Sequence, residues 1–504
     1  MAHTEQIYEQ LCQHARETAF LVSTESMLGW DERTMLPVAA GGFRADQMAF
    51  LAGLIHQRRT DPRLGEWLGE LAHSPLAADV HSDAGATIRQ LRREYDKKVK
   101  LPQALVEELT RTASLGQHVW QETRANDDFA SFAPILEKTY SLKREQAQAI
   151  GYKHDAYDAL LDDFEPGEST ANITRVLADL RGALVPLVAE IAASKRVPEI
   201  AILSRRYPID MQEWFGRTTA ARIGFDFRRG RLDVTAHPFC SGMGPHDCRI
   251  TTRYDEHFFP SSFFGTLHEA GHGIYDQGLR PDMYGLPPSE AVSLGIHESQ
   301  SRMWENLVGR SWPFWQHFFP TAQQTFTEAL GEVSLEDFYF AVNDVRPSLI
   351  RVEADEATYN LHILVRFELE QALLSGDLPV GDLPGAWQEK YSQYLGITPP
   401  NDSEGVLQDI HWAAGLVGYF PTYSLGNLYA AQLFEAADRA CGNLHAQFAR
   451  GEFEPLHAWL GKHIHQVGQR YTAAEMVKHV TGQTLSHAPL IAHLRGKLAP
   501  LYGL

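Results

Sequence analysis

The stretch SFFGTLHEAGHGIYDQ, residues 262–277, carries the strongest structural and chemical signal in the chain. Its apolar residues recur at helical spacing, which predicts an α-helix over 262–277. His268 and His272 are four positions apart, so they project from one face of that helix. Glu269 is rotated by roughly 100° from His268 and can stand beside a metal held by the two imidazoles. This is the H-E-x-x-H arrangement of zinc peptidases.

Two glycines, Gly271 and Gly273, flank His272. A glycine inside a helix costs about 1 kcal/mol relative to alanine. The pair therefore indicates that another segment approaches this helix closely. The competing interpretation is an ordinary helix with two histidines at its surface, and the glycines argue against it.

A catalytic zinc site usually has three protein ligands and a water, so a third ligand is needed. The segment PPSEAVSLGIHESQSRMWENLVG, residues 287–309, predicts the next helix, with Ser289 as its N-terminal cap. Glu298 on this helix is the candidate third ligand, which would give a set of two histidines and a glutamate. His297 and Glu305 are the competing candidates.

Helical periodicity extends over most of the 504 residues, of which 44% are hydrophobic. It predicts, for example, helices over 105–125 and from a cap at Ser169 or Thr170. One region differs: residues 231–240 and 247–256 are rich in β-branched residues and are joined by SGMGPH. They predict a small two-stranded antiparallel ribbon that packs against the motif helix. The expected fold class is mainly α.

Charge and cysteine content exclude several classes of protein. The formal charge is -19, from 45 basic and 64 acidic residues, which disfavours nucleic-acid binding. The four cysteines, Cys12, Cys240, Cys248 and Cys441, form no CxxC pair, and free thiols are expected. No segment has the 18 or more apolar residues of a membrane helix, and the polar N-terminus does not resemble a signal peptide. We expect a cytoplasmic protein that binds no membrane.

Eight short blocks occur in order along the chain: WDERTMLP (30–37), RADQ (44–47), HPF (237–239), D-x-R-x-T (247–251), HEAGH (268–272), HESQ (297–300), IRVEAD (350–355) and GVLQDIHW (405–412). With these blocks the chain resembles the M32 family of metallocarboxypeptidases, the thermostable carboxypeptidase Taq type. Leu36 in the first block departs from the residue expected there, and we attach no functional weight to it.

The resemblance implies a large, nearly all-helical metallopeptidase with a deep active-site groove. We expect one peptidase unit over 1–504, with a helical part over about 1–200 forming one wall and a catalytic part over about 201–504. It also implies a homodimer that removes C-terminal residues from peptides one at a time, with broad preference.

By the same resemblance, His268, His272 and Glu298 bind one divalent metal and Glu269 is the general base. Zinc is the expected metal, and cobalt or manganese are the alternatives, because affinity order alone does not select among them.

Peptide hydrolysis also needs a donor for the developing oxyanion. Tyr423 and His411 are the first candidates, since both are neutral donors near pH 7, and Tyr419 is a third. A packed tyrosine at an aromatic-rich helix end is the alternative for each tyrosine. Tyr419 and His237, which stands in the HPF block, are expected to line the groove.

A carboxypeptidase must also bind a free carboxylate, which the planar fork of arginine matches best. Arg351 is the first candidate, and its alternative role is an ion pair with Asp355. Arg249 is the second candidate, with Asp247 or Asp255 as ion-pair partners. His463 and His465 lie in a polar stretch and are expected at the surface.

Two other functions fit the motif. A related metallopeptidase that cuts internally would share it, and only the requirement for a free C-terminus separates the two. A binding protein with a non-catalytic metal is the third reading, but it has no use for Glu269, and structural zinc favours closed sites rich in cysteine.

Overall fold

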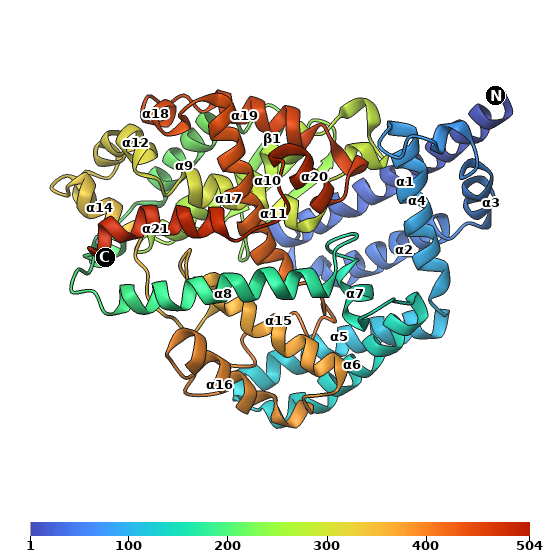
Figure 1. The fold of residues 1–504 in the computed structure, drawn as a ribbon, viewed down its shortest axis with the longest axis horizontal. Helices are drawn as coiled ribbons and strands as arrows, with labels where there is room; N and C mark the ends of the chain where they lie inside the picture. The colour runs from blue at the N-terminus through green and yellow to red at the C-terminus, as the bar shows by residue number, and fades with distance from the viewer. Residues whose placement is uncertain (1) are drawn as a thin grey trace. The chain divides into compact units, whose positions relative to one another are not determined.

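The computed structural model describes residues 2–504, which divide into two compact units interleaved along the chain. Unit 1 comprises residues 1–99, 199–342 and 433–483, and unit 2 comprises residues 100–198, 343–432 and 484–504. Figure 1 shows the chain as mostly helix, with one small sheet. The mainly α fold class is confirmed. No helix among residues 2–504 is long and apolar enough to cross a membrane.

Unit 1 contains the sheet and the motif helix. Its elements of six or more residues are α1 (Ala2–Thr34), α2 (Gly41–Arg59), α3 (Pro62–Leu71), α4 (Asp83–Lys100), α9 (Ile209–Ile223), α10 (Phe259–Gly278), α11 (Leu294–Arg302), the π-helical turn η6 (Met303–Val308), α12 (Trp312–Thr325), α14 (Leu335–Val342), α18 (Leu444–Ala449), α19 (Glu454–Leu460) and α20 (Ala473–Thr481), with strand β3 (Asp247–Thr252). Strands β1 (Gly230–Val234) and β2 (Cys240–Gly244) complete the sheet.

The sheet has three strands in the order β1-β3-β2. Strand β2 pairs with β3 antiparallel, and β1 pairs with β3 parallel. The expected ribbon is therefore corrected: residues 231–240 do not form one strand antiparallel to 247–256. The chain leaves the sheet after Val234 and returns at Cys240 on the far edge of β3. The alternation of β-branched residues indicated strands here, but it carries no information on their relative direction.

Helix α10 packs against β3 and is the buried centre of unit 1. Pro260 stands in its first turn, where a missing N–H costs nothing. Phe259 and Phe263 stack on each other with ring centroids 5.1 Å apart, and Phe215 of α9 stacks on Phe263 at 5.2 Å. This aromatic packing fixes the helix that carries the two histidines.

Unit 2 is helical. Its α-helices are α5 (Gln103–Asn126), α6 (Phe129–Ile150), the short α7 (Ala156–Leu161), α8 (Thr170–Ala192), α15 (Tyr359–Ser375), α16 (Leu383–Leu395) and α21 (Ala488–Tyr502), while α17 (Pro421–Cys441) begins in unit 2 and ends in unit 1. The helix expected over 105–125 is confirmed as α5, and Ser169 caps α8 by accepting a hydrogen bond from Asn172 N. The single-unit organisation expected for 1–504, divided near residue 200, stays a prediction.

Candidate functional site

Helices α10 and α11 lie beside each other in unit 1 and together carry the candidate metal ligands (Figure 1). A Cβ on Gly271 would lie 2.6 Å from Gln300 O and 2.6 Å from Ser301 Cα, so only glycine lets α11 come this close. A Cβ on Gly273 would lie 2.5 Å from the Phe225 ring. The close approach expected from the two glycines is confirmed.

The helix after the motif begins later than expected. Helix α11 starts at Leu294, and its cap is Ser293, whose side chain accepts a hydrogen bond from Ile296 N. Ser289 instead lies in the short turn η5 (Pro287–Ser289) and donates to Arg280 O. Two consecutive prolines followed by serine resemble a helix start, but the Pro287 turn ends after three residues, and the chain runs extended from Glu290.

His268, His272 and Glu298 form a cluster whose ligand atoms all lie within 4.8 Å of one another. Glu298 Oε2 is 3.7 Å from His268 Nε2 and 3.4 Å from His272 Nε2. Two ligands of a tetrahedral ion bound at about 2.0–2.2 Å would be about 3.3–3.6 Å apart. The donor types and their spacing therefore fit one divalent cation.

The other ring nitrogen of each histidine is also engaged. His268 Nδ1 lies 2.9 Å from Glu305 Oε2, and His272 Nδ1 lies 2.5 Å from His297 Nδ1. His297 in turn lies with Nε2 3.0 Å from Asp276 Oδ1. Such outer partners fix the orientation of the ring and leave Nε2 free to bind a metal. Glu305 and His297, the competing third ligands, thus occupy the positions of supporting residues.

Arg302 bridges Glu298 and Glu305. Its Nε donates to Glu298 at 2.7 Å, and its NH1 donates to Glu305 at 3.3 Å. Burial alone would raise the pKa of Glu298, but Arg302 and the two histidines hold that pKa well below its usual range. Glu305 stands in the π-helical turn η6, which follows α11 without a break. Such turns are often found at functional sites, where they re-aim side chains.

Glu269 lies on α10 next to the cluster and is only 6% exposed. Burial raises the pKa of its carboxyl to about 7, despite the opposing effect of His268. A carboxyl with a pKa near neutrality can both accept and return a proton.

A second group of sequence candidates lies in unit 2, around Asp409. Arg351 is 5% exposed and donates to Asp409 Oδ1 from Nε at 3.0 Å and from NH2 at 2.7 Å. Arg366 donates to Asp409 Oδ2 at 2.6 Å. The expected alternative partner, Asp355, does not pair with Arg351; Asp355 accepts hydrogen bonds from Thr358 instead. Asp355 is four residues from Arg351, but Arg351 lies in a short 3-10 turn rather than in a longer helix.

The three oxyanion candidates lie together in this group. His411 Nε2 is 3.2 Å from the Tyr423 hydroxyl, and the ring of Tyr419 lies 5.3 Å from the ring of Tyr423. The Arg351 guanidinium lies 5.0 Å from the Tyr423 ring centre. Burial, which outweighs the attraction of Asp409, lowers the pKa of His411 to about 4, so its imidazole is neutral near pH 7.

The remaining candidates lie in unit 1. Arg249 donates two hydrogen bonds to Asp247, both at 2.9 Å, and its guanidinium lies 4.4 Å from the Trp30 ring centre. Its ion-pair alternative is thus observed with Asp247. His237 is exposed in the link between β1 and β2.

Sequence reasoning missed two partners, the buried Arg366 and the partly buried Asp276. Asp276 follows His272 by four residues on the same helix face, which was a usable signal. Arg366 stands 15 residues beyond Arg351 with no local pattern that connects it to Asp409. The expectation for His465 was wrong: it is fully buried in the π-helical turn η9 (Gly461–His465), with Nε2 3.1 Å from Gln300 Oε1.

Several known proteins are similar to this chain over almost its whole length. The profile of the family described as Carboxypeptidase Taq (M32) metallopeptidase matches residues 10–498. Thermostable carboxypeptidase 1 of Thermus thermophilus is 49% identical over 508 residues, covering 99% of each chain. Carboxypeptidase 1 of Bacillus subtilis is 38% identical over 477 residues, covering 95% of each chain.

Solved structures give the same result. The crystal structure of an M32 carboxypeptidase from Deinococcus radiodurans has a TM-score of 0.96 and 40% identity, covering 99% of this chain and 100% of that one. The match extends over almost the whole chain in every comparison. The chain therefore belongs to the Carboxypeptidase Taq (M32) metallopeptidase family and is a metallocarboxypeptidase, a peptide hydrolase.

Proposed function

We propose that this metallocarboxypeptidase removes single residues from the free C-terminus of peptides, with broad preference for the residue removed. One divalent cation, zinc by preference, binds His268, His272 and Glu298, and Glu269 is the general base. The membership of the chain in a metallopeptidase family implies a divalent metal but does not identify it. A set of two imidazoles and a carboxylate is a known catalytic zinc set, and it also accepts cobalt or manganese.

The observation that carries this proposal is the pairing of ring nitrogens in the cluster. Each histidine turns Nε2 towards Glu298, while its Nδ1 meets Glu305 or His297. In an ordinary pair of surface histidines, we would not expect both ring nitrogens of each residue to face a polar side chain. The arrangement matches a metal site with its outer partners in place.

A bound divalent cation supplies Lewis acidity, which polarises a peptide carbonyl and lowers the pKa of water towards 7. Glu269 is placed on the metal-binding helix, one residue from His268, and is buried. In the proposed reaction, its carboxylate accepts the proton of the attacking water. It then returns that proton to the leaving amine, so the residue ends each cycle unchanged.

The group around Asp409 supplies the remaining functions in this proposal. Arg351 binds the substrate's terminal carboxylate, and Asp409 fixes the orientation of its guanidinium through two hydrogen bonds. Tyr423 donates its hydroxyl hydrogen to the developing oxyanion, and neutral His411 orients that hydroxyl. Arg249, whose fork is already paired with Asp247, is the second candidate for the carboxylate.

The experiment that tests the function is a mass-spectrometric time course on one peptide, prepared with a free and with an amidated C-terminus. The zinc-loaded protein is expected to shorten the free acid one residue at a time and to leave the amide intact, and chelated protein should cleave neither. A set of peptides that differ only in the last residue measures the breadth of preference. Internal cuts in both peptides would identify an oligopeptidase and remove the carboxylate role from Arg351.

A further inference from the structure

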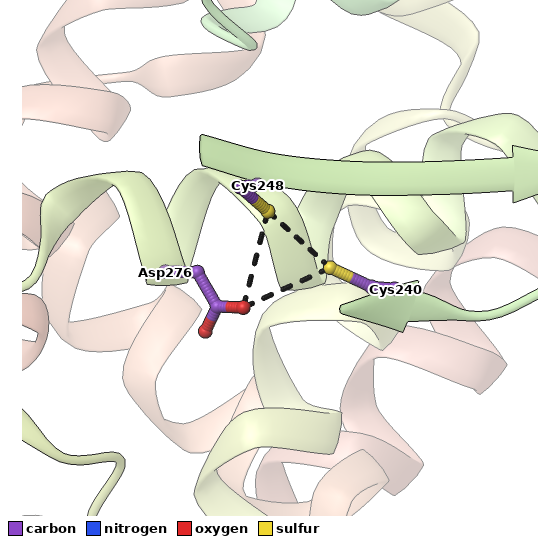
Figure 2. Close-up of side chains that lie close together, drawn as sticks. All are labelled: Cys240, Cys248 and Asp276. Atoms are coloured by element: carbon purple, nitrogen blue, oxygen red, sulfur yellow. Dashed lines mark hydrogen bonds between the residues drawn. The ribbon is translucent and has the colours of Figure 1, made fainter. Parts of the chain in front are cut away.

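A second cluster of metal-ligating side chains lies in unit 1, apart from the two histidines and Glu298. Cys240 stands on β2, Cys248 on the neighbouring strand β3, and Asp276 on α10, and Figure 2 shows the three side chains pointing towards one another. The two Sγ atoms are 3.5 Å apart, and Asp276 Oδ2 lies 3.8 Å from Cys240 Sγ and 3.9 Å from Cys248 Sγ. The two Sγ atoms and Asp276 Oδ2 thus form a nearly equilateral triangle.

A glycine beside this triangle leaves room for the carboxylate of Asp276. Gly242 lies directly opposite Cys248 in the antiparallel pair of β2 and β3. A Cβ on Gly242 would lie 3.0 Å from Asp276 Oδ2, so the glycine leaves the space into which the carboxylate reaches. Oδ1 of the same carboxylate meets His297 Nε2 at 3.0 Å, which leaves Oδ2 to face the two thiols.

The dimensions of the triangle match one face of a tetrahedral metal site. With metal–sulfur bonds of about 2.3 Å and a metal–oxygen bond of about 2.0 Å, tetrahedral angles place two sulfur ligands about 3.8 Å apart and sulfur and oxygen about 3.5 Å apart. The observed separations of 3.5, 3.8 and 3.9 Å each lie within about 0.4 Å of these values. No rearrangement of the backbone is needed to bring three donors onto one ion.

We propose that Cys240, Cys248 and Asp276 form a second cation site, which binds a thiophilic, tetrahedral divalent cation such as zinc or cadmium. Thiolate donors favour soft and borderline cations over magnesium or calcium. Binding is a proton exchange without electron transfer: each thiol that ligates the ion releases its proton to solvent as its S–H bond is replaced by a bond to the metal. Asp276 also lines a cavity of about 570 Å³, together with Gly242 and Met243 of β2.

The rival for these two thiols is a disulfide. An S–S bond is about 2.05 Å long, so the sulfur atoms would have to move about 1.5 Å closer. The hydrogen bond to Cys248 and burial raise the pKa of the Cys240 thiol well above its usual value. The hydrogen bond to Cys240 lowers the pKa of Cys248, but burial and the carboxylates of Asp276 and Asp247 outweigh it and raise that pKa. A protonated thiol is a poor nucleophile, which slows oxidation in the absence of a metal. The third donor, Asp276, has no role in a disulfide but is a natural ligand.

The test uses the intact protein, stripped of metal under reducing conditions and then titrated with cadmium. Cadmium bound to thiolate gives an ultraviolet charge-transfer band that a site of histidine and glutamate cannot give. We expect about two cations per chain in the wild type and about one in the Cys240→Ser variant, which should lose the band but keep the histidine site. Cys441→Ser is the matched control, because Cys441 is also a partly buried free thiol and lies outside the cluster; it should bind like the wild type.

A second variant removes no ligand. Gly242→Ala should push Asp276 Oδ2 away and weaken cadmium binding at this site by roughly tenfold or more, with the band still present at saturation. A wild-type protein that binds one cation without a thiolate band would overturn the proposal. A second result would also overturn the proposal. If two titratable thiols are lost in air, and adding cadmium beforehand does not prevent that loss, the pair forms a disulfide instead.

Discussion

At the scale of single residues, the sequence spacing predicted which donor atoms lie close together in the structure. His268 and His272 were assigned to one helix face because they are four residues apart, and their Nε2 atoms do face Glu298. The hydrogen-bond partners of the other candidate residues could not be predicted from sequence spacing. Asp409 pairs with Arg351 and Arg366 from positions more than 40 residues away, and only tertiary folding determines such pairs.

Arg351→Ala is expected to lower kcat/KM for free-acid peptides by roughly ten- to hundredfold, because hydrogen bonds to a charged group contribute about 1.5–3 kcal/mol. The measurement is steady-state kinetics on a peptide series. Arg249→Ala is the comparison, because Arg249 is the second candidate: a larger loss in that variant than in Arg351→Ala would move the carboxylate site to Arg249. If Arg351 only neutralises Asp409, the variant will unfold at a lower temperature while its kinetics stay unchanged.

The buried side chain of His465 should make the stability of the fold depend on pH. Burial lowers its pKa to about 3, whereas an unfolded histidine titrates near 6.5. The unfolded chain therefore binds the extra proton between these values, so His465 costs stability as pH falls below about 6.5, by up to about 1.4 kcal/mol per pH unit.

In His465→Gln, whose amide can still donate to Gln300, the unfolding midpoint should fall less steeply between pH about 6.5 and 4 than in the wild type. Thermal melts across this range measure the slope. His463→Gln is the control from the same turn, because His463 is only partly buried. Parallel slopes in wild type and His465→Gln would show that another group dominates acid unfolding.

At the scale of elements, helix type was predictable and helix ends were less so. Periodicity located α5 and α8, because each buries one apolar face, whereas α10 is buried on most of its surface. The N-terminal cap of α11 was misplaced by four residues, at Ser289 instead of Ser293, and the direction of β1 was missed, because both depend on packing rather than on local pattern. The two glycines of α10 were the most informative local signal.

Gly271→Ala is expected to weaken metal binding by about ten- to hundredfold, because a Cβ there would collide with the backbone of α11 and displace Glu298. Gly265→Ala is a matched control on the same helix, since its Cβ would meet only Thr252 Oγ1, at 4.0 Å. That variant should keep its metal and gain up to about 1 kcal/mol of stability. Competition with a chromophoric chelator measures metal affinity, and equal affinities in the two variants would contradict the role of close helix packing.

At the scale of the whole molecule, the chain passes between its two units several times. No change in composition along the sequence indicates where it does so. Resemblance to the family indicated the length and the overall class, but not which segments fold together. The expected homodimer stays a prediction. Sedimentation of the purified protein across a range of concentrations measures it, with a mass of twice 56.6 kDa expected.

Metal removal should lower the unfolding temperature of the protein. A ligand that binds only the folded state adds about 2.7 kcal/mol when present at 100 times its Kd. Scanning calorimetry with chelator and with added zinc measures the shift. In the Cys240→Ser variant, the zinc-induced rise in unfolding temperature should come from the histidine site alone. Adding His272→Ala to that variant should therefore remove most of the remaining rise. A full zinc shift in the double variant would place the stabilising ion elsewhere.

In the proposed site, His268, His272 and Glu298 hold the metal while Glu269 moves the proton. Bound metal and peptide turnover, measured together in Glu269→Gln and in His272→Ala, test this division of roles. We expect Glu269→Gln to keep its metal at wild-type affinity and to lose turnover by at least about 10²-fold, whereas His272→Ala should lose both. A Glu269→Gln protein that loses its metal, or one that still turns over peptide at the wild-type rate, would contradict these roles.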